Sequence, residues 1–204
     1  KSQEVWKDGR KNKWQSPQVV PPDIKKLKKS SLLAKIKPQL ATLVDKVPIG
    51  EDWLHEMKWD GYRLMSVIDK KVKLITRNGL DWTSDFPSIE AEMNQLNLKK
   101  TILDGEVVVL DEKGKPSFQL LQNALNEKTK DPMIYYLFDI IYYEGHNLSE
   151  VPLIERKALL EKIIPVGNEV LHYSDHIIGH GEKVFKKACK YGLEGIISKK
   201  VQST

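Results

Sequence analysis

Cysteine is almost absent from this sequence, which has a single one, Cys189, in 204 residues. One thiol forms no internal disulfide and no cysteine cluster around a metal, so a disulfide-stapled secreted fold and a zinc ribbon are excluded. The five histidines show no metal-ligand spacing with other ligands, and we assign them no metal. These absences indicate a reducing compartment.

Long apolar runs are missing as well. No uninterrupted stretch approaches the ~20 residues that span a bilayer, and the start, KSQEVWKDGRKNKW, lacks the apolar block of a secretory signal. We therefore expect a cytoplasmic protein without a membrane anchor. With 40% hydrophobic residues, the chain can still bury the core of one domain with extensions.

Positive charge is concentrated at the start of the chain. Residues 1–37 hold 11 Lys or Arg against 3 acidic residues, while the remainder holds 22 against 25. Such an arm suits a polyanionic partner, and it is equally typical of a solvated linker. Because SPQVVPPDIKKLKKSS also lacks apolar periodicity, we expect a basic tether or interdomain linker over 1–37 and a folded domain over 38–204.

Within the expected domain, short β-rich runs alternate with amphipathic helices. Strands are predicted near 53–59, 62–68, 72–77, 101–111, 134–143, 169–173 and 194–199, and helices near 87–96, 117–126, 153–164 and 180–191. The runs 62–68 and 72–77 flank DKK and form a plausible hairpin, which favours antiparallel sheet. The predicted class is α+β, with antiparallel sheets flanked by helices.

One lysine stands inside a strand-like run, Glu56-Met57-Lys58-Trp59-Asp60-Gly61. Alternate side chains of a strand share a face, so Glu56, Lys58 and Asp60 are expected to point the same way. Taken alone, this row is more typical of a surface ion-pair ladder than of a reactive centre.

Further carboxylates accompany apolar residues in TILDGEVVVLD. Asp104 and Glu106 share a strand face with Val108, and a carboxylate in an apolar setting needs a cation, a metal or hydrogen-bond donors. Magnesium with a nucleotide phosphate would satisfy that need, and so would a structural ion pair. In IYYLFDIIYY, Phe138 fits either the core or the edge of a pocket that stacks a purine. Glu194, in LEGIISKK, fits a solvated strand end.

Taken in order, these segments resemble the covalent nucleotidyltransferases: ATP-dependent DNA ligases, RNA ligases and mRNA capping enzymes. The run from Lys58 to Arg63 matches the nucleophile motif K-x-D-G-x-R, and TRNGLDWTSDFP, LDGEVVV, YYLFDIIYYEG and EGIISKK are similar to the ligase motifs that follow. The stretch KPQLATLV…DWLHEMKWDGYR is most similar to the ligase domain of bacterial ligase D, a multidomain end-joining enzyme.

The resemblance implies an ATP-grasp-like nucleotidyltransferase fold and a role for each matching residue. Lys58 would attack the α-phosphate of ATP, expel pyrophosphate and carry AMP, which then passes to a DNA 5′-phosphate for attack by a 3′-hydroxyl. The other implied contacts are Glu56 with adenine, Arg63 and Arg77 with ribose or phosphate, Glu106 with ribose hydroxyls or a metal, Phe138 stacked on adenine, and Glu194 with Mg²⁺ or Mn²⁺.

The resemblance also implies partners and limits. Nicked or broken duplex DNA would be the substrate, with phosphoesterase or polymerase modules in the same longer chain, an end-binding protein and a place in the bacterial cytosol at the nucleoid. The family's last nucleotide-binding motif and OB-fold domain do not follow before Thr204, so we expect a folded piece with little or no nick sealing.

Two alternatives stay open at this point. A GTP-dependent capping guanylyltransferase shares K-x-D-G, and a catalytically silent nucleic-acid-binding module could keep the same fold. The joint presence of Lys58, Glu106 and Glu194 argues against the silent module.

Overall fold

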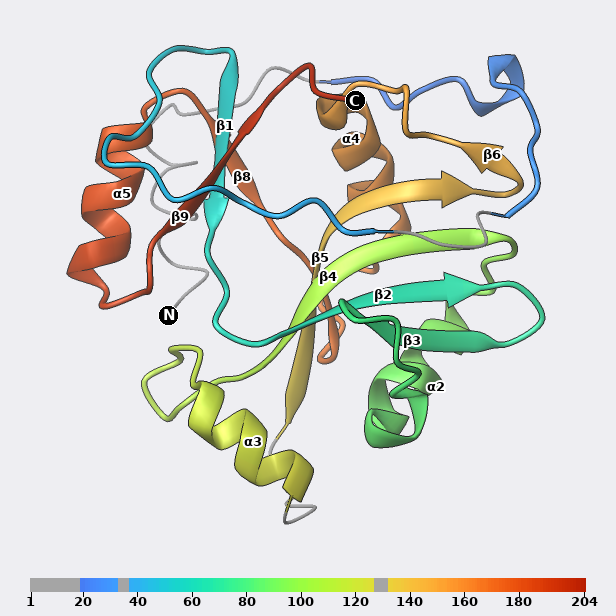
Figure 1. Ribbon diagram of the computed structural model, residues 1–204, viewed down its shortest axis with the longest axis horizontal. Coiled ribbons are helices and arrows are strands. Elements are labelled where there is room, and N and C mark those ends of the chain that lie inside the picture. Colours follow the sequence, from blue (N-terminus) through green and yellow to red (C-terminus); the bar gives the residue numbers. More distant parts are fainter. Residues whose placement is uncertain (1–18, 33–36, 127–131) are drawn as a thin grey trace.

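Two sheets that meet at the centre of the molecule form the frame of the protein (Figure 1). The computed structural model describes residues 19–32, 37–126 and 132–204. In the three-stranded sheet, β1 (Trp53–Met57) lies between β8 (His176–Ile178) and β9 (Ile196–Lys200), antiparallel to both. This small sheet carries the strand that leads to Lys58.

The larger sheet has six strands in the order β3-β2-β4-β5-β6, with β7 paired to β5. Its strands are β2 (Tyr62–Ile68), β3 (Val72–Thr76), β4 (Thr101–Val109), β5 (Met133–Tyr143), β6 (His146–Asn147) and β7 (Leu171–Tyr173). All neighbours are antiparallel except β7, which runs parallel to β5. Val67 faces Lys73 and Ile68 faces Val72, which confirms the predicted hairpin.

Helices flank both sheets (Figure 1). They are α2 (Pro87–Gln95), α3 (Phe118–Asn126), α4 (Leu153–Ile163) and α5 (Gly181–Lys190), with short 3-10 turns η1 (Ile24–Lys26) and η2 (Thr83–Asp85). The helix α5 packs on the small sheet, α2 and α3 pack on the larger one, and α4 contacts both. Apolar strand residues such as Leu103, Leu137 and Ile140 meet α2 and α4 in the main core.

The fold prediction of α+β with antiparallel sheets is confirmed. Each predicted strand and helix has a counterpart, and the differences have local causes. The strand expected from residue 194 begins at Ile196, because Gly195 has a φ of 155°, a conformation that favours glycine and breaks the extended run. The short strands β6 and β8 were not predicted, because they are set by pairing with β5 and β1 rather than by their own pattern.

Part of the expected tether contacts the domain. The backbones of Lys29 and His146 form an isolated antiparallel β-bridge, and the amide of Ser30 donates to the carbonyl of Gly145 at 2.9 Å. Ile24 and Leu27 pack against the main core. Residues 1–18 lie outside the described part of the chain, and the boundary between residues 37 and 38 stays a prediction. Among the described residues, no helix has the length and apolar character needed to cross a membrane.

Candidate active site

The chain crosses from the small sheet to the large sheet through Lys58-Trp59-Asp60-Gly61. The amide of Lys58 donates to the carbonyl of Gly195 at 3.1 Å, which ties the crossing to the start of β9. Trp59 stacks on Tyr136 with ring centroids 3.4 Å apart, and its Nε1 donates to Ser174 Oγ at 3.1 Å. The crossing is thereby fixed at both sheets, with Lys58 at their junction.

Gly61 is required by a close approach between the crossing and β4. A Cβ at this position would collide with the carbonyl oxygen of Val107 and would lie 2.9 Å from Val108 Cγ1. Because a backbone carbonyl of a central strand cannot move aside, no side chain fits here. The glycine of K-x-D-G therefore lets the crossing pass against the sheet.

We expect Gly61→Ala to lower the free energy of unfolding by about 1–3 kcal/mol, the usual cost of overpacking. Urea unfolding would measure this loss. The matched control is Gly79→Ala, where the added methyl meets open space and only the strain of a positive φ applies. An unchanged free energy of unfolding in Gly61→Ala would contradict the close-approach argument.

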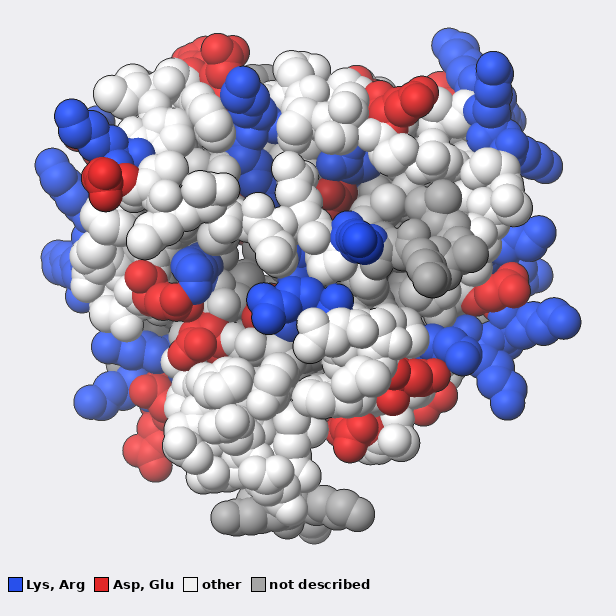
Figure 2. Space-filling view, in the orientation of Figure 1, with Lys and Arg blue, Asp and Glu red and all other residues white. Residues whose placement is uncertain are grey.

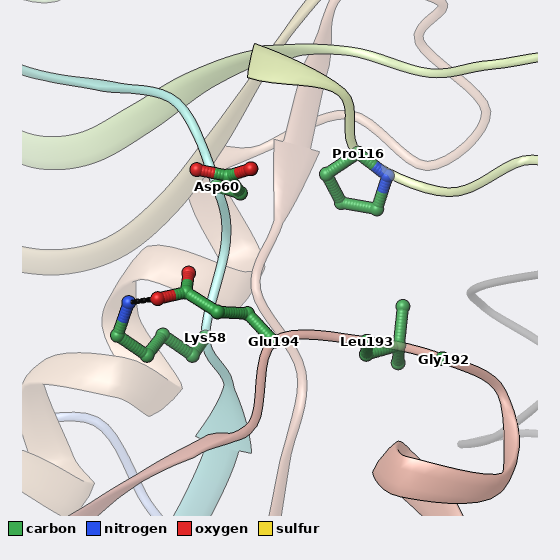
Figure 3. A pocket seen from close by; sticks show the side chains of 6 residues that line it. All are labelled: Lys58, Asp60, Pro116, Gly192, Leu193 and Glu194. Carbon is green, nitrogen blue, oxygen red and sulfur yellow. Dashed lines mark hydrogen bonds and ion pairs between the residues drawn. The ribbon is translucent and has the colours of Figure 1, made fainter.

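Lys58 and Glu194 line an open pocket of about 280 Å³ at the junction (Figure 3). The Lys58 ammonium donates to Glu194 Oε1, and the two side chains are 42% and 44% exposed. Asp60 lies on the Lys58 side of the pocket, while Pro116, Gly192 and Leu193 border the rest. A lysine amine is therefore accessible to a ligand and paired with a carboxylate.

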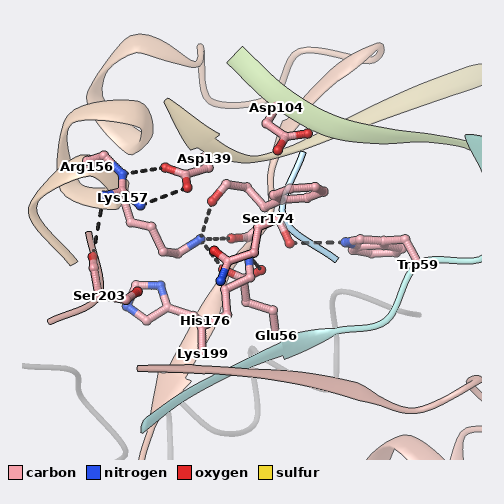
Figure 4. A network of polar contacts seen from close by, with 12 residues as sticks. Glu56, Trp59, Asp104, Asp139, Arg156, Lys157, Ser174, His176, Lys199 and Ser203 are labelled. Carbon is pink, nitrogen blue, oxygen red and sulfur yellow. Dashed lines mark hydrogen bonds and ion pairs between the residues drawn. The ribbon is translucent and has the colours of Figure 1, made fainter. Parts of the chain in front are cut away.

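Glu56 is buried two residues before Lys58, at 2% exposure. Its Oε1 lies 2.6 Å from the Nζ of Lys157, and its Oε2 accepts from the Nζ of Lys199 at 2.7 Å (Figure 4). Burial raises the pKa of this carboxyl, but the two ammonium groups outweigh burial and hold the pKa of Glu56 below its usual value. Glu56 is therefore ionised at neutral pH.

The expected ladder of Glu56, Lys58 and Asp60 on one strand face is wrong. Since β1 ends at Met57, strand alternation does not extend to Lys58 or Asp60. Glu56 turns inward to lysines of α4 and β9, whereas Lys58 turns to Glu194.

Asp104 finds its counter-charge in Arg63. The Nε of Arg63 donates to Oδ1 at 3.0 Å and its Nη2 to Oδ2 at 2.6 Å, while Nη1 donates to the carbonyl of Gln39. Burial raises the pKa of Asp104, and Arg63 opposes that rise. The structural ion pair, one of the two options for this carboxylate, is the one observed.

Glu106 lies opposite Arg63 in the register of β2 and β4, and no ion pair is found for it among the described residues. Burial raises the pKa of Glu106 to about 7; Arg63 and Lys58 oppose the shift, and Asp104 and Asp60 add to it. Lys58 and Asp60, the charged residues of the crossing, are among the groups that act on Glu106. Glu106 is therefore a partly buried carboxylate without an ion pair in the described part of the chain.

Phe138 and Arg77 differ in their surroundings. Phe138 is half-buried outside the three apolar clusters of the described residues, with Arg63 Cζ 5.2 Å and Lys199 Nζ 4.4 Å from its ring centroid. That placement favours a pocket edge over the core. Arg77 is exposed directly after β3, one residue beyond Thr76, which pairs with Leu64 of β2. The hairpin register therefore places Arg77 at the level of Arg63.

The described residues contain no group of three or more His, Cys, Asp or Glu side chains that could hold a metal ion. Magnesium sites that also bind phosphate commonly use only one or two carboxylates. The poorly compensated charge of Glu106 and the exposed carboxylate of Glu194 fit such a shared site, with substrate phosphates completing it.

Two lysines of the site were not assigned a role from the sequence. Lys199 stood in EGIISKK as a strand residue, and Lys157 was treated only as part of a helix. A signal for Lys157 was available, because helical spacing places it on the buried stripe of Leu153, Leu160 and Ile164. A lysine on such a stripe indicates a buried partner.

Basic side chains border a hollow near the centre of the face seen in Figure 2, between the small sheet and the large sheet. The site residues come from both sides of this junction: Glu56, Lys58, Glu194 and Lys199 from the small-sheet side, and Arg63, Glu106 and Phe138 from the large sheet. The junction therefore carries charges of both signs, and its lysines and arginine suit contacts with phosphate groups.

Comparison with known proteins gives one consistent family. The family model described as ATP dependent DNA ligase domain matches residues 31–204. The multifunctional non-homologous end joining protein LigD of Pseudomonas aeruginosa is 47% identical over 170 residues, covering 82% of this chain and 20% of that protein. The chain thus spans about a fifth of the length of this curated relative.

Solved structures agree. A mycobacterial DNA ligase D complexed with ATP and MES superposes with a TM-score of 0.71 at 33% identity, covering 82% of this chain and 55% of that one. The ligase domain of M. tuberculosis LigD superposes with a TM-score of 0.65 at 34% identity, covering 76% of this chain and 50% of that one. These matches favour ATP-dependent ligation over the capping guanylyltransferase that K-x-D-G left open. The chain belongs to the ATP-dependent DNA ligase family, as an adenylation domain like that of LigD.

Proposed function

We propose that this domain activates DNA ends for end joining through an AMP group carried on Lys58. The observation that carries the proposal is the accessible Lys58 amine at the junction of the two sheets, paired with Glu194 and facing a pocket. A reactive lysine must be reachable by substrate, and this one is.

The adenylation step requires an unprotonated Lys58 amine. A lysine amine is almost wholly protonated at neutral pH, so its proton must leave before attack. Glu194 already accepts a hydrogen bond from the ammonium and is the nearest group to which that proton can move. The amine then attacks the α-phosphorus of ATP, one N–P bond forms, and the bond to the pyrophosphate oxygen breaks.

The remaining site residues are proposed to bind and orient ATP. Glu56 would accept from the exocyclic amine of adenine, Phe138 would stack on the base, and Arg63 and Arg77 would contact ribose or phosphate. Glu106 and Glu194 would hold Mg²⁺ or Mn²⁺. When bound, such an ion offsets negative charge on the phosphates during in-line transfer.

The end-joining assignment rests on the name of the LigD relatives, of which this chain covers only part. Nicked or broken duplex DNA is the proposed substrate. Phosphoesterase or polymerase modules and an end-binding protein are proposed partners, in the cytoplasm at the nucleoid. By itself, the domain is expected to seal few nicks or none.

Mass spectrometry of the purified chain tests the proposal. After incubation with magnesium and ATP, we expect a mass gain of one AMP, located on the Lys58 peptide and reversed by pyrophosphate. GTP should give none. Equal labelling by GTP would favour the guanylyltransferase. Absence of any adduct, both here and in a chain extended to the full LigD ligase domain, would favour the silent module.

A further inference from the structure

Lys157 is a charged side chain without access to solvent. It lies in the middle of α4 with a side-chain exposure of 0%. Its Nζ is 2.6 Å from Glu56 Oε1, donates to the carbonyl of Ser174 at 3.0 Å and reaches the carbonyl of Phe138 at 3.4 Å (Figure 4). The buried ammonium is therefore surrounded by one carboxylate and two backbone carbonyls.

The three partners come from three different elements. Glu56 is on β1, Phe138 is on β5, and Ser174 is in the turn between β7 and β8. The ring of Tyr173 lies 4.7 Å from the ammonium and shields it further. Lys157 therefore holds a carboxylate of the small sheet at a fixed position relative to the backbone of the large sheet.

Stability alone does not account for a lysine here. Buried ion pairs cost much desolvation, and well-packed apolar residues of similar volume are often as stable or more so. A methionine would extend the apolar stripe of α4 without that cost. What a methionine could not do is fix the direction of the Glu56 carboxylate.

We propose that Lys157 is a positioning residue that orients Glu56 toward the exocyclic amine of adenine and thereby sets the preference of the site for ATP. The inference rests on the proposed function, in which Glu56 faces the base. The polar contacts of Lys157 are with Glu56 and with the backbone carbonyls of Phe138 and Ser174. Its effect must pass through Glu56 and through the backbone of Phe138.

Lys199 has a different part in this arrangement. It binds the second oxygen of Glu56, but it is 23% exposed and also lies over the Phe138 ring, so it can reach a bound nucleotide directly. Because Oε1 faces Lys157 and is buried, Oε2 on the side of Lys199 is the oxygen that remains for a further donor. Loss of Lys157 frees Glu56 to rotate toward Lys199.

The test compares two nucleotides that differ only in the contacted group. On a Lys58→Ala background, which keeps binding non-covalent, calorimetry would measure the dissociation constants of ATP and of purine riboside triphosphate, which carries hydrogen in place of the 6-amino group. We expect Lys157→Met to weaken the binding of ATP about tenfold, which is the scale of one hydrogen bond to a charged group. The binding of the analogue should weaken less than about twofold.

Lys162→Met is the matched control, because it makes the same substitution at an exposed position of the same helix. It should change neither constant. Equal weakening of both nucleotides by Lys157→Met would overturn the proposal, since a merely structural role affects both alike. So would no change in either constant. A parent chain that binds the two nucleotides equally would instead refute the placement of Glu56 at the adenine amine.

A double variant guards against a folding defect. Lys157→Met alone leaves Glu56 with only Lys199, whereas Glu56→Gln with Lys157→Met removes both charges of the buried pair. If Lys157 acts through Glu56, the double variant should discriminate between the nucleotides as poorly as Glu56→Gln alone. A further tenfold loss of ATP affinity in the double variant would show an independent role and overturn the proposal.

Discussion

Replacing Lys58 with alanine should slow formation of the AMP adduct by at least about a thousandfold, while the domain remains folded. The two effects should separate because the role proposed for Lys58 is chemical and its contribution to stability is small. Its only ion pair among the described residues joins two side chains that are 42% and 44% exposed. Such surface pairs contribute about 0–1 kcal/mol to the free energy of unfolding.

Lys58→Arg separates the positive charge of this side chain from its ability to act as a nucleophile. A guanidinium can keep the ion pair with Glu194, yet it stays protonated and cannot attack phosphorus. We expect no adduct by intact-mass analysis after incubation with magnesium and ATP, and thermal unfolding close to that of the parent. Lys71→Ala, in the exposed turn between β2 and β3, is the control and should keep full adduct formation. An adduct that persists in both Lys58 variants would assign the nucleophile to another residue.

Lys58 and Glu194 could be expected in one site because both match motifs of the ligase family, although they are 136 residues apart in sequence. The K-x-D-G crossing needs a glycine where the chain passes the carbonyl of Val107. Glu194 precedes Gly195, whose carbonyl accepts from the Lys58 amide. Motif order was therefore enough to expect Lys58 and Glu194 together, even though strand alternation failed at that point.

The partners of Glu56 could not be predicted in the same way. Lys157 and Lys199 are about a hundred or more residues distant in sequence, and only the packing of α4 and β9 around β1 brings them to one carboxylate. Alternation indicates which face a residue takes, but it does not indicate what lies on that face. The choice between a structural ion pair and a metal likewise needed the structure. Asp104 forms an ion pair with Arg63, whereas Glu106 has no ion pair among the described residues.

The second large effect concerns pH and Glu106. Burial raises the pKa of this carboxyl in the folded protein from 4.5 to about 7. Between these pH values the folded state holds a proton that the unfolded chain has lost, so the free energy of unfolding falls as pH rises through this window. Above pH 7 the full penalty applies, about 3 kcal/mol at 1.36 kcal/mol per pKa unit.

Glu106→Gln should therefore stabilise the domain at pH 8 by up to about 3 kcal/mol and by much less at pH 5, because glutamine has no proton to lose. Urea unfolding at both pH values measures the difference from the parent. Glu112→Gln, at an exposed position after β4, should change stability at neither pH. If the parent and Glu106→Gln differ equally at pH 5 and pH 8, the raised pKa is refuted.

The same variant should lose adenylation while it gains stability, which distinguishes a functional carboxylate from a structural one. A divalent cation that binds ionised Glu106 stabilises only the folded state and should restore the stability of the parent at pH 8. The ion cannot bind a glutamine at this position in the same way. Magnesium should therefore reduce the difference in the free energy of unfolding between the parent and Glu106→Gln at pH 8. A difference at pH 8 that is unchanged by magnesium would remove Glu106 from the proposed metal site. A carboxylate buried at position 106 would then need a role other than metal binding.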